Sequence, residues 1–281
     1  MSVKPTISYG HGFVDDCTNA TLANWDKAEA GLTGALSVVN DDSFDFVCVG
    51  AGGYVVWTNH TALGLSTTVF TKFRVRYKVI SGSGTVSIYL QFSDTTSQTI
   101  VAAGASAVWK TIVAVITSGK TLNYIHIQGN GSSIEFQVDF LLIYKSDFTI
   151  PNTGMLAHFS VAGRLPILEP VSALGDTIQN LGVHSAVVEM HCNLDIGTWT
   201  RAGDLLPGQV FLDIIQASMT EPFQWITLGV QQAQFKVLLE TPDFQYAASE
   251  SKASHNLLLT FREYRRAPAN SETAVERFGL T

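Results

Sequence analysis

The sequence predicts a mainly β protein with an N-terminal β-sandwich and a C-terminal α+β domain that contains two short helices. Turn residues punctuate the first 150 positions at short intervals, and the runs between them are rich in β-branched and aromatic residues. Evenly spaced short strands of this kind are typical of a sandwich or jelly roll. After position 150, segments with helical spacing alternate with strand-like segments.

This change of pattern predicts a domain boundary near Ile150–Gly154. We expect an N-terminal domain at 1–150, a second domain at 151–266 and a polar, turn-rich arm at 267–281. A chain of 281 residues is long enough for each domain to bury its own core.

The composition excludes several classes of partner. The net charge of −7, without an excess of basic residues in either half, argues against nucleic acid and against an anionic membrane surface. No stretch approaches the roughly 20 apolar residues that span a bilayer. Cys17, Cys48 and Cys192 are too widely spaced for a zinc or redox pair, and we interpret them as small buried hydrophobes.

Strands are predicted in the N-terminal half wherever apolar runs stand between turns. They cover 70–80, 85–92, 110–116, 124–128 and 134–144, with Gly-rich turns predicted at 50–53, 81–84 and 129–131. Alternation in Phe73–Val79 places Arg74, Arg76 and Lys78 on a solvated face. His126, between two isoleucines, is predicted to point outward from its strand.

The C-terminal half combines helix and strand signals. Helices are predicted at 173–182, where Leu174, Ile178 and Leu181 share one face, and at 207–217. Strands are predicted at 185–194, 223–228, 233–240 and 255–265. The polar segment 247–254 is either a hairpin tip that reaches a neighbouring subunit or an ordinary loop.

The sequence holds no recognisable catalytic motif. It lacks a Gly-x-Ser-x-Gly elbow and an HExxH helix, and no helix follows the glycines at 50–53 as a phosphate-binding loop would require. We therefore expect a protein that is not an enzyme. A glycoside hydrolase is the alternative within the enzymes, because its two carboxylates are defined by their geometry in space and not by their spacing in the sequence.

The first half resembles the carbohydrate-binding-module and galactose-binding-like jelly rolls. The resemblance covers most of residues 13–146 and rests on ordered segments at 24–25, 52–54, 73–77, 109–111, 122–127 and 138–140. It implies recognition of a sugar by aromatic rings, with Tyr54, Trp57, Tyr89 and Trp109 as candidates. Each ring could instead belong to the core, and strand alternation allows at most one of Tyr54 and Trp57 to point outward.

The same resemblance implies a structural calcium ion. Asp139 lies in the last strand, where many such modules place a calcium ligand, and Asp16, Asp15 or Asp26 could add oxygen atoms. A solvated or hydrogen-bonded aspartate is the alternative interpretation.

The second half resembles the barrel domains of tailed-phage baseplate hub and distal tail proteins. The resemblance spans about residues 155–266 and includes an opening strand at 158–163, the first helix, 225–229 and 256–264. It implies assembly in a ring around the tail axis, with other tail proteins (tail tube, hub, fibre) as partners. Distal tail proteins carry the ring barrel first, so the domain order here is reversed.

Together the two resemblances predict a structural component of a virus tail. On this hypothesis the protein is made in the host cytoplasm and resides in the virion, where the jelly roll binds host-surface glycan or neighbouring tail proteins. The alternative is a free carbohydrate-binding adhesin or an accessory module of a glycan-degrading system.

Overall fold

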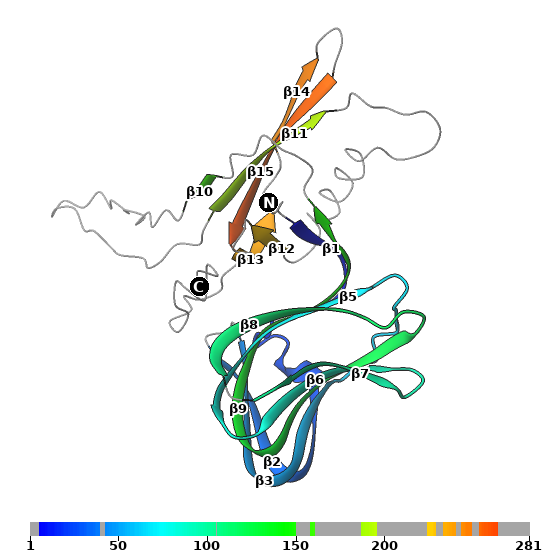
Figure 1. The fold of residues 1–281 in the computed structure, drawn as a ribbon, viewed down its shortest axis with the longest axis vertical. Helices are drawn as coiled ribbons and strands as arrows, with labels where there is room; N and C mark the ends of the chain where they lie inside the picture. Colours follow the sequence, from blue (N-terminus) through cyan, green and yellow to red (C-terminus); the bar gives the residue numbers. More distant parts are fainter. Residues whose placement is uncertain are drawn as a thin grey trace, which may run out of the picture. The chain divides into compact units, whose positions relative to one another are not determined.

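The structure is a computed structural model, and it describes residues 6–39, 43–104, 106–149, 158–160, 187–195, 224–228, 233–239, 243–248 and 253–263. These residues are mainly β, as predicted, with a single short 3-10 helix among them, η1 (Leu22–Asn24). The chain divides into two compact units (Figure 1). The N-terminal unit is built mainly from Ser8–Asp147 and the C-terminal unit mainly from Met1–Ile7 and Phe148–Asn270.

The N-terminal unit is an antiparallel sheet organised around one long strand, β9. Its strands are β1 (Thr6–Asp15), β2 (Trp25–Val39), β3 (Ser43–Asn59), β4 (Leu65–Ser66), β5 (Lys72–Gly82), β6 (Thr85–Phe92), β7 (Ser97–Ala103), β8 (Ser106–Val115) and β9 (Thr121–Thr149). One edge of β9 pairs with β3, and β5 and β6 follow one another along its other edge. Outside these strands, β2 pairs with β3, β7 with β6, and β8 with β5.

Glycines and bulges cross the sheet along one line, which we call the glycine crease. The β2–β3 and β3–β9 ladders shift register there, at Gly31 and between Cys48 and Tyr54. Gly82 in β5 pairs with Ile134 of β9, so the break between β5 and β6 falls on the same line. The crease contains Gly31, Gly50, Gly52, Gly53, Gly82, Gly84, Gly104, Gly129 and Gly131.

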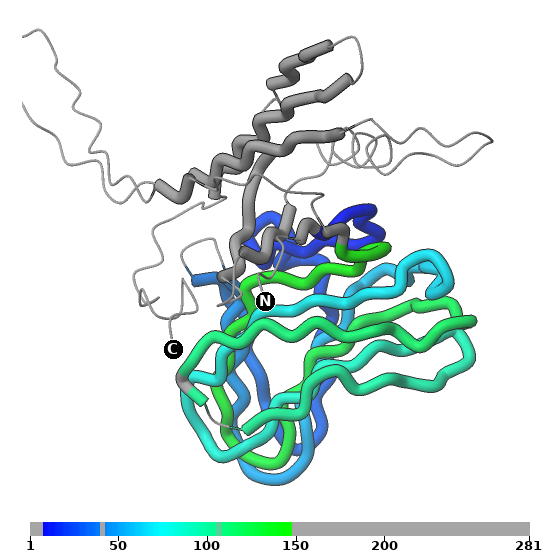
Figure 2. Tube along the Cα trace, turned by 45° about the horizontal axis from the view of Figure 1, so that its top comes forward, coloured from blue at the N-terminus to red at the C-terminus, as the bar shows by residue number. Residues whose placement is uncertain are grey.

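The strands fold over at the crease, so that two parts of the same sheet face each other. Phe46 and Trp57 lie 11 residues apart in β3, which in a straight strand would separate them by about 36 Å. Their ring centroids are instead 4.9 Å apart, and Trp57 also meets Phe136 of β9 at 6.4 Å. The result is a β-sandwich, and Figure 2 shows the blue-to-green tube of this unit curving back on itself.

We name the two layers after their distinctive strands. The β6 half contains β6, β7 and the parts of β2, β3 and β9 that pair near them, residues 25–31, 54–59 and 121–130. The β5 half contains β5, β8 and residues 32–39, 43–50 and 132–144. Apolar side chains from both halves fill the space between them, and Val55, Phe73, Ile88, Ile127 and Phe136 are among those with no exposed surface.

The structure corrects two predictions made for this unit. The glycines at 50–53 and 129–131 were predicted to form turns, but they lie inside β3 and β9 at the crease. Arg74 was predicted to be solvated, but it is only 3% exposed. Its guanidinium donates to the Tyr144 hydroxyl and the Asp147 carboxylate, at 3.1 and 2.9 Å, and these partners allow it to be buried.

The described part of the C-terminal unit is also antiparallel. It consists of β10 (His158–Ser160), β11 (Val187–Asp195), β12 (Gln224–Leu228), β13 (Ala233–Leu239), β14 (Asp243–Ala248) and β15 (Ala253–Glu263). β15 pairs with β11, β13 and β14, and the start of β1 adds to β12 through Thr6 and Ile7. The predicted strands correspond to β11, β12, β13 and β15, and the opening strand predicted at 158–163 overlaps β10. Strand β14 was not predicted.

Some predictions for this half fall on residues that the structure does not describe. The boundary at 150–154, the helices at 173–182 and 207–217, and the arm at 267–281 all lie outside the described residues. The segment 247–254 joins β14 to β15, which pair from Asp243 with Leu258 to Ala248 with Ala253, so its described ends belong to a hairpin. No helix among the described residues is long and apolar enough to cross a membrane.

Candidate functional site

The side of the β6 half that points away from the core is aromatic and polar. Along each strand its residues alternate with buried core residues such as Val55, Ile88 and Ile127. Its members, which we call the polar face, are Tyr54, Val56 and Thr58 of β3, Tyr124, His126, Gln128 and Asn130 of β9, and Thr85, Ser87, Tyr89 and Gln91 of β6. None of these residues is Asp, Glu, Lys or Arg, although Asp26 of β2 pairs with Thr58 at the edge of the face. The centre of the face therefore offers rings, amides and hydroxyls rather than formal charge.

Aromatic rings stand at the centre of the polar face. Tyr89 and His126 are paired across β6 and β9, and their rings stack with centroids 4.7 Å apart and planes inclined by 19°. Tyr124 continues this row, with its ring centroid 6.2 Å from that of His126. Tyr54, on the neighbouring strand, is 42% exposed. The rings therefore form a platform on a rigid sheet.

Hydrogen bonds between polar side chains hold these rings in place. The Tyr89 hydroxyl donates to Oε1 of Gln128 at 3.0 Å, and the Gln128 amide donates to Asn130. Nδ1 of His126 lies 2.8 Å from the Thr58 hydroxyl, and Nε2 lies 3.2 Å from Oε1 of Gln91. Because an amide oxygen only accepts, Nε2 carries the imidazole proton and Nδ1 accepts from Thr58.

The surroundings of His126 and Tyr89 disfavour the charged forms of these two side chains. Burial lowers the pKa of His126, which disfavours the imidazolium form. Burial raises the pKa of Tyr89, and the nearby Tyr54 phenol adds to that shift. Neutral rings flanked by amides and hydroxyls suit a neutral ligand that offers apolar C–H faces and many hydroxyl groups.

The structure places the predicted aromatic residues in different environments. Tyr54 and Tyr89 both belong to the polar face. Trp57 is 1% exposed and packs between Phe46 and Phe136 in the core, so in this conformation it is not available to a surface ligand. The alternation argument that only one of Tyr54 and Trp57 points outward is confirmed.

Trp109 lies on the β5 half, among basic residues. The guanidinium of Arg76 sits 4.9 Å from the centroid of its ring, and the ammonium of Lys78 sits 5.8 Å from it. Arg76 also pairs with Asp139 at 2.9 Å. Its environment is thus a cation–π cluster, distinct from the row of Tyr89, His126 and Tyr124.

The predicted calcium ligands are not assembled into a cation site. Asp139 faces Arg76, a cation that competes for the same carboxylate, and Asp16 accepts from the Thr18 hydroxyl at 3.1 Å. Asp15 is occupied too, since its carboxylate accepts from Nε1 of Trp25 and the Thr21 hydroxyl, both at 2.7 Å. The described residues contain no group of three or more His, Cys, Asp and Glu side chains that could hold a metal ion. Calcium binding stays a prediction.

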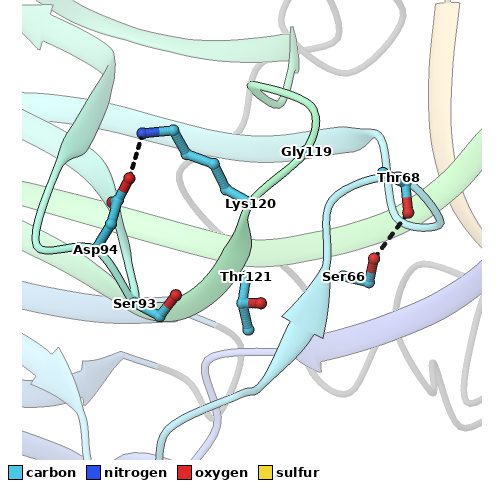
Figure 3. A pocket seen from close by; sticks show the side chains of 7 residues that line it. All are labelled: Ser66, Thr68, Ser93, Asp94, Gly119, Lys120 and Thr121. Atoms are coloured by element: carbon cyan, nitrogen blue, oxygen red, sulfur yellow. Dashed lines mark hydrogen bonds and ion pairs between the residues drawn. The ribbon is translucent and has the colours of Figure 1, made fainter.

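A polar hollow of about 350 Å³ lies beyond the end of β6, next to the end of β4 and the start of β9. Its lining residues are Ser66, Thr68, Ser93, Asp94, Gly119, Lys120 and Thr121. Figure 3 shows the Lys120 side chain reaching the Asp94 carboxylate, with Ser93 and Thr121 close by. Nζ of Lys120 lies 2.8 Å from Oδ2 of Asp94. This contact, together with hydrogen bonds from Thr96, lowers the pKa of Asp94 to about 2.

The alternation in β9 could have identified two further residues of the polar face, Tyr124 and Gln128, which were not among the predicted ligand contacts. Tyr124, His126 and Gln128 alternate with Ile125 and Ile127, and the outward direction predicted for His126 is confirmed. The same parity would have placed Tyr124 and Gln128 beside it. Their neighbours Tyr89 and Gln91 depend on the register between β6 and β9, which the sequence alone does not show.

No family model matches the chain, and no curated protein matches it. Solved structures of carbohydrate-binding modules are among those that match, and they align with the N-terminal half. The family 11 module of a cellulosomal cellulase of Clostridium thermocellum is 14% identical over 44% of this chain and 88% of that chain, with a TM-score of 0.36. A family 11 module from the same organism, in complex with a β-1,3-1,4-mixed-linked tetrasaccharide, is 14% identical over 50% and 96%, also at 0.36. A family 29 module mutant complexed with cellohexaose is 16% identical over 51% and 94%, at 0.35.

Proposed function

We propose that the N-terminal unit binds a neutral glycan chain on the polar face. The observation that supports this most directly is the stacked pair of Tyr89 and His126, held by the uncharged side chains of Gln91 and Gln128. The proposal is for binding rather than catalysis, because Tyr89, His126 and their hydrogen-bond partners include no carboxylate that could act as an acid or a nucleophile.

The physical basis is the match between this face and a sugar ring. A pyranose has an apolar C–H face, which gains by stacking on an aromatic ring, and an edge of hydroxyls that both donate and accept. Amide side chains such as those of Gln91 and Gln128 offer both donors and acceptors. Tyr54 pairs with Asn130 of β9, which is about 20 Å along that strand from Tyr124. The aromatic residues therefore extend far enough to contact several sugars of one chain.

The test begins with a glycan array on the full chain, followed by calorimetry with cellohexaose and mannohexaose. Tyr89→Ala and Tyr124→Ala should each weaken binding by about tenfold, since a lost ring contact of about 1.4 kcal/mol corresponds to that factor. Trp109→Ala is the matched control, because it removes an aromatic ring from the β5 half and should leave the affinity unchanged. A blank array together with no heat from either hexasaccharide would overturn the proposal. Loss of binding in Trp109→Ala alone would move the site to the β5 half.

For the whole chain we propose a role in a virus tail, in which the second domain assembles into a ring. What supports it is the resemblance of residues 155–266 in sequence, which neither the solved structures nor the described residues test. The rival is the free adhesin or accessory module. Native mass spectrometry of the purified protein with tail partners should detect a ring or a ring-bound subunit, and a persistent monomer would favour the rival.

A further inference from the structure

The polar hollow lies on the side of the sheet that carries the polar face. Phe92 of β6 pairs with Leu122 of β9, and both side chains are buried in the core, at 3% and 0% exposure. Ser93 and Thr121, each next to one of these residues, are exposed. The β6–β9 ladder shifts register between Gln91 and Phe92, so Thr121 lies on the same side as Tyr124 despite the odd spacing between them. Thr121 is three residues from Tyr124, or about 10 Å along the strand. The hollow therefore extends the polar face beyond its aromatic row.

The hollow differs from the polar face because it contains a carboxylate and an ammonium side by side. Lys120 neutralises Asp94, so the pair presents an acceptor and a donor without attracting a net charge. The Asp94 carboxylate is held from the other side by the backbone N–H and the hydroxyl of Thr96. The Lys120 ammonium also lies over the Phe92 ring, 5.1 Å from its centroid.

Two hydroxyls in the lining of the hollow are available to a ligand. Within the described residues, the side-chain oxygens of Ser93 and Thr121 have no hydrogen-bond partner, and Figure 3 shows both side chains below the contact between Asp94 and Lys120. The floor is rigid, because the Thr67 hydroxyl accepts from the Lys120 N–H at 2.9 Å and donates to the Lys120 carbonyl at 3.0 Å. The volume of the hollow, about 350 Å³, is near the lower end of the range of roughly 300–1,000 Å³ that small-ligand pockets occupy.

We propose that this hollow is a second sugar subsite, which takes a unit with two adjacent hydroxyls from the same glycan that stacks on Tyr89. One hydroxyl donates to the Asp94 carboxylate while its neighbour accepts from the Lys120 ammonium, and Ser93 and Thr121 bind the remaining polar atoms. This inference rests on the proposed function, since it deepens the same binding site. We specify a neutral ligand because the Asp94 carboxylate would repel an anion and the Lys120 ammonium would repel a cation.

The test uses the full chain and calorimetry with cellohexaose and mannohexaose, which are longer than the distance of about 16 Å from His126 to Thr121. Asp94→Asn keeps the acceptor for Thr96 but removes the charge, and Lys120→Met keeps a long unbranched side chain but removes the donor. Each should weaken binding by about tenfold, as expected for loss of a hydrogen bond to a charged group. Ser83→Ala, at the exposed crease, is the matched control and should bind like the wild type.

The outcomes separate this subsite from the proposed function. If Tyr89→Ala weakens binding while Asp94→Asn and Lys120→Met do not, the subsite is overturned and glycan binding on the polar face stands. If no variant can be compared because neither hexasaccharide binds, both proposals fail. The melting temperature of each variant shows whether Asp94 and Lys120 act only by stabilising the fold. The subsite requires a lower affinity in variants whose melting temperature is unchanged. A lower affinity that accompanies partial unfolding would count against it.

Discussion

At the scale of single residues, His126 connects the stacking and the hydrogen bonding of the polar face. Its ring lies against Tyr89, and its nitrogens have different partners, Thr58 and Gln91. Protonation of Nδ1 would turn an acceptor into a donor, so the Thr58 hydroxyl would have to reverse its direction. The neutral tautomer is therefore the form that this arrangement stabilises.

Acidification should destabilise the N-terminal unit partly through His126. Because burial lowers the pKa of this residue, the unfolded chain takes up the proton at a higher pH than the folded chain does. The stability from its neutral form is complete above the unfolded pKa of about 6.5 and is lost as the pH falls through the folded pKa. Urea unfolding of wild type and His126→Gln at about pH 7 and pH 5.5 should show a smaller pH effect in the variant. An equal effect in both proteins would assign the pH dependence to other groups.

Strand parity predicted single residues well where a strand is regular, and poorly where burial depends on a distant partner. It placed Trp57 opposite to Tyr54, and His126 outward, because alternation is a local property. It failed for Arg74, since the partners that allow this cation to be buried, Tyr144 and Asp147, lie about 70 residues away. Neither the Tyr89–His126 stack nor the Asp94–Lys120 pair has a local signal in the sequence.

At the scale of elements, the glycine crease determines the sandwich. The bulges at the crease shift which residues face the core, from Phe44 and Phe46 on one side in β3 to Val55 and Trp57 on the other. Glycine is required where the backbone has a positive φ and where strands approach closely. A run of glycines is compatible with a turn or with a bulge. After a bulge the chain continues along the same partner strand, whereas after a turn it reverses direction. For this reason the sequence could not distinguish a fold of the whole sheet from a series of hairpins.

Neighbouring glycines at the crease should respond very differently to alanine. At Gly53, with φ +94°, an added Cβ would collide with the backbone carbonyl of Ala30, whereas at Gly52, with φ +75°, it would meet nothing within 4 Å. Gly52→Ala should cost about 1–2 kcal/mol from its backbone conformation alone. Gly53→Ala should cost about 3 kcal/mol or more, because the fixed backbone of β2 must also move. Urea denaturation of both variants measures the difference, and equal losses would contradict the role assigned to close packing at the crease.

At the scale of the whole molecule, the two compact units do not divide at a single point in the sequence. The described strands of the C-terminal unit include Thr6 and Ile7, which pair with Thr227 and Ile226 of β12. The sequence predicted strands of that unit from local patterns, but this pairing joins positions about 220 residues apart and leaves no local trace. Strand identity is thus local information, whereas strand partners and unit composition are not.

A chain that begins at Ser8 should therefore weaken the C-terminal unit and leave the N-terminal unit intact. The deletion removes the residues that pair with β12 and leaves its backbone groups without partners on that side. We expect calorimetry to show a lower melting temperature for one transition, by about 5 °C, if the lost pairing contributes on the order of 1–2 kcal/mol. Glycan binding on the polar face should be unchanged, because its residues belong to the N-terminal unit. An unchanged melting profile would show that the pairing of Thr6 and Ile7 contributes little, and a shift in both transitions would show that the units unfold together.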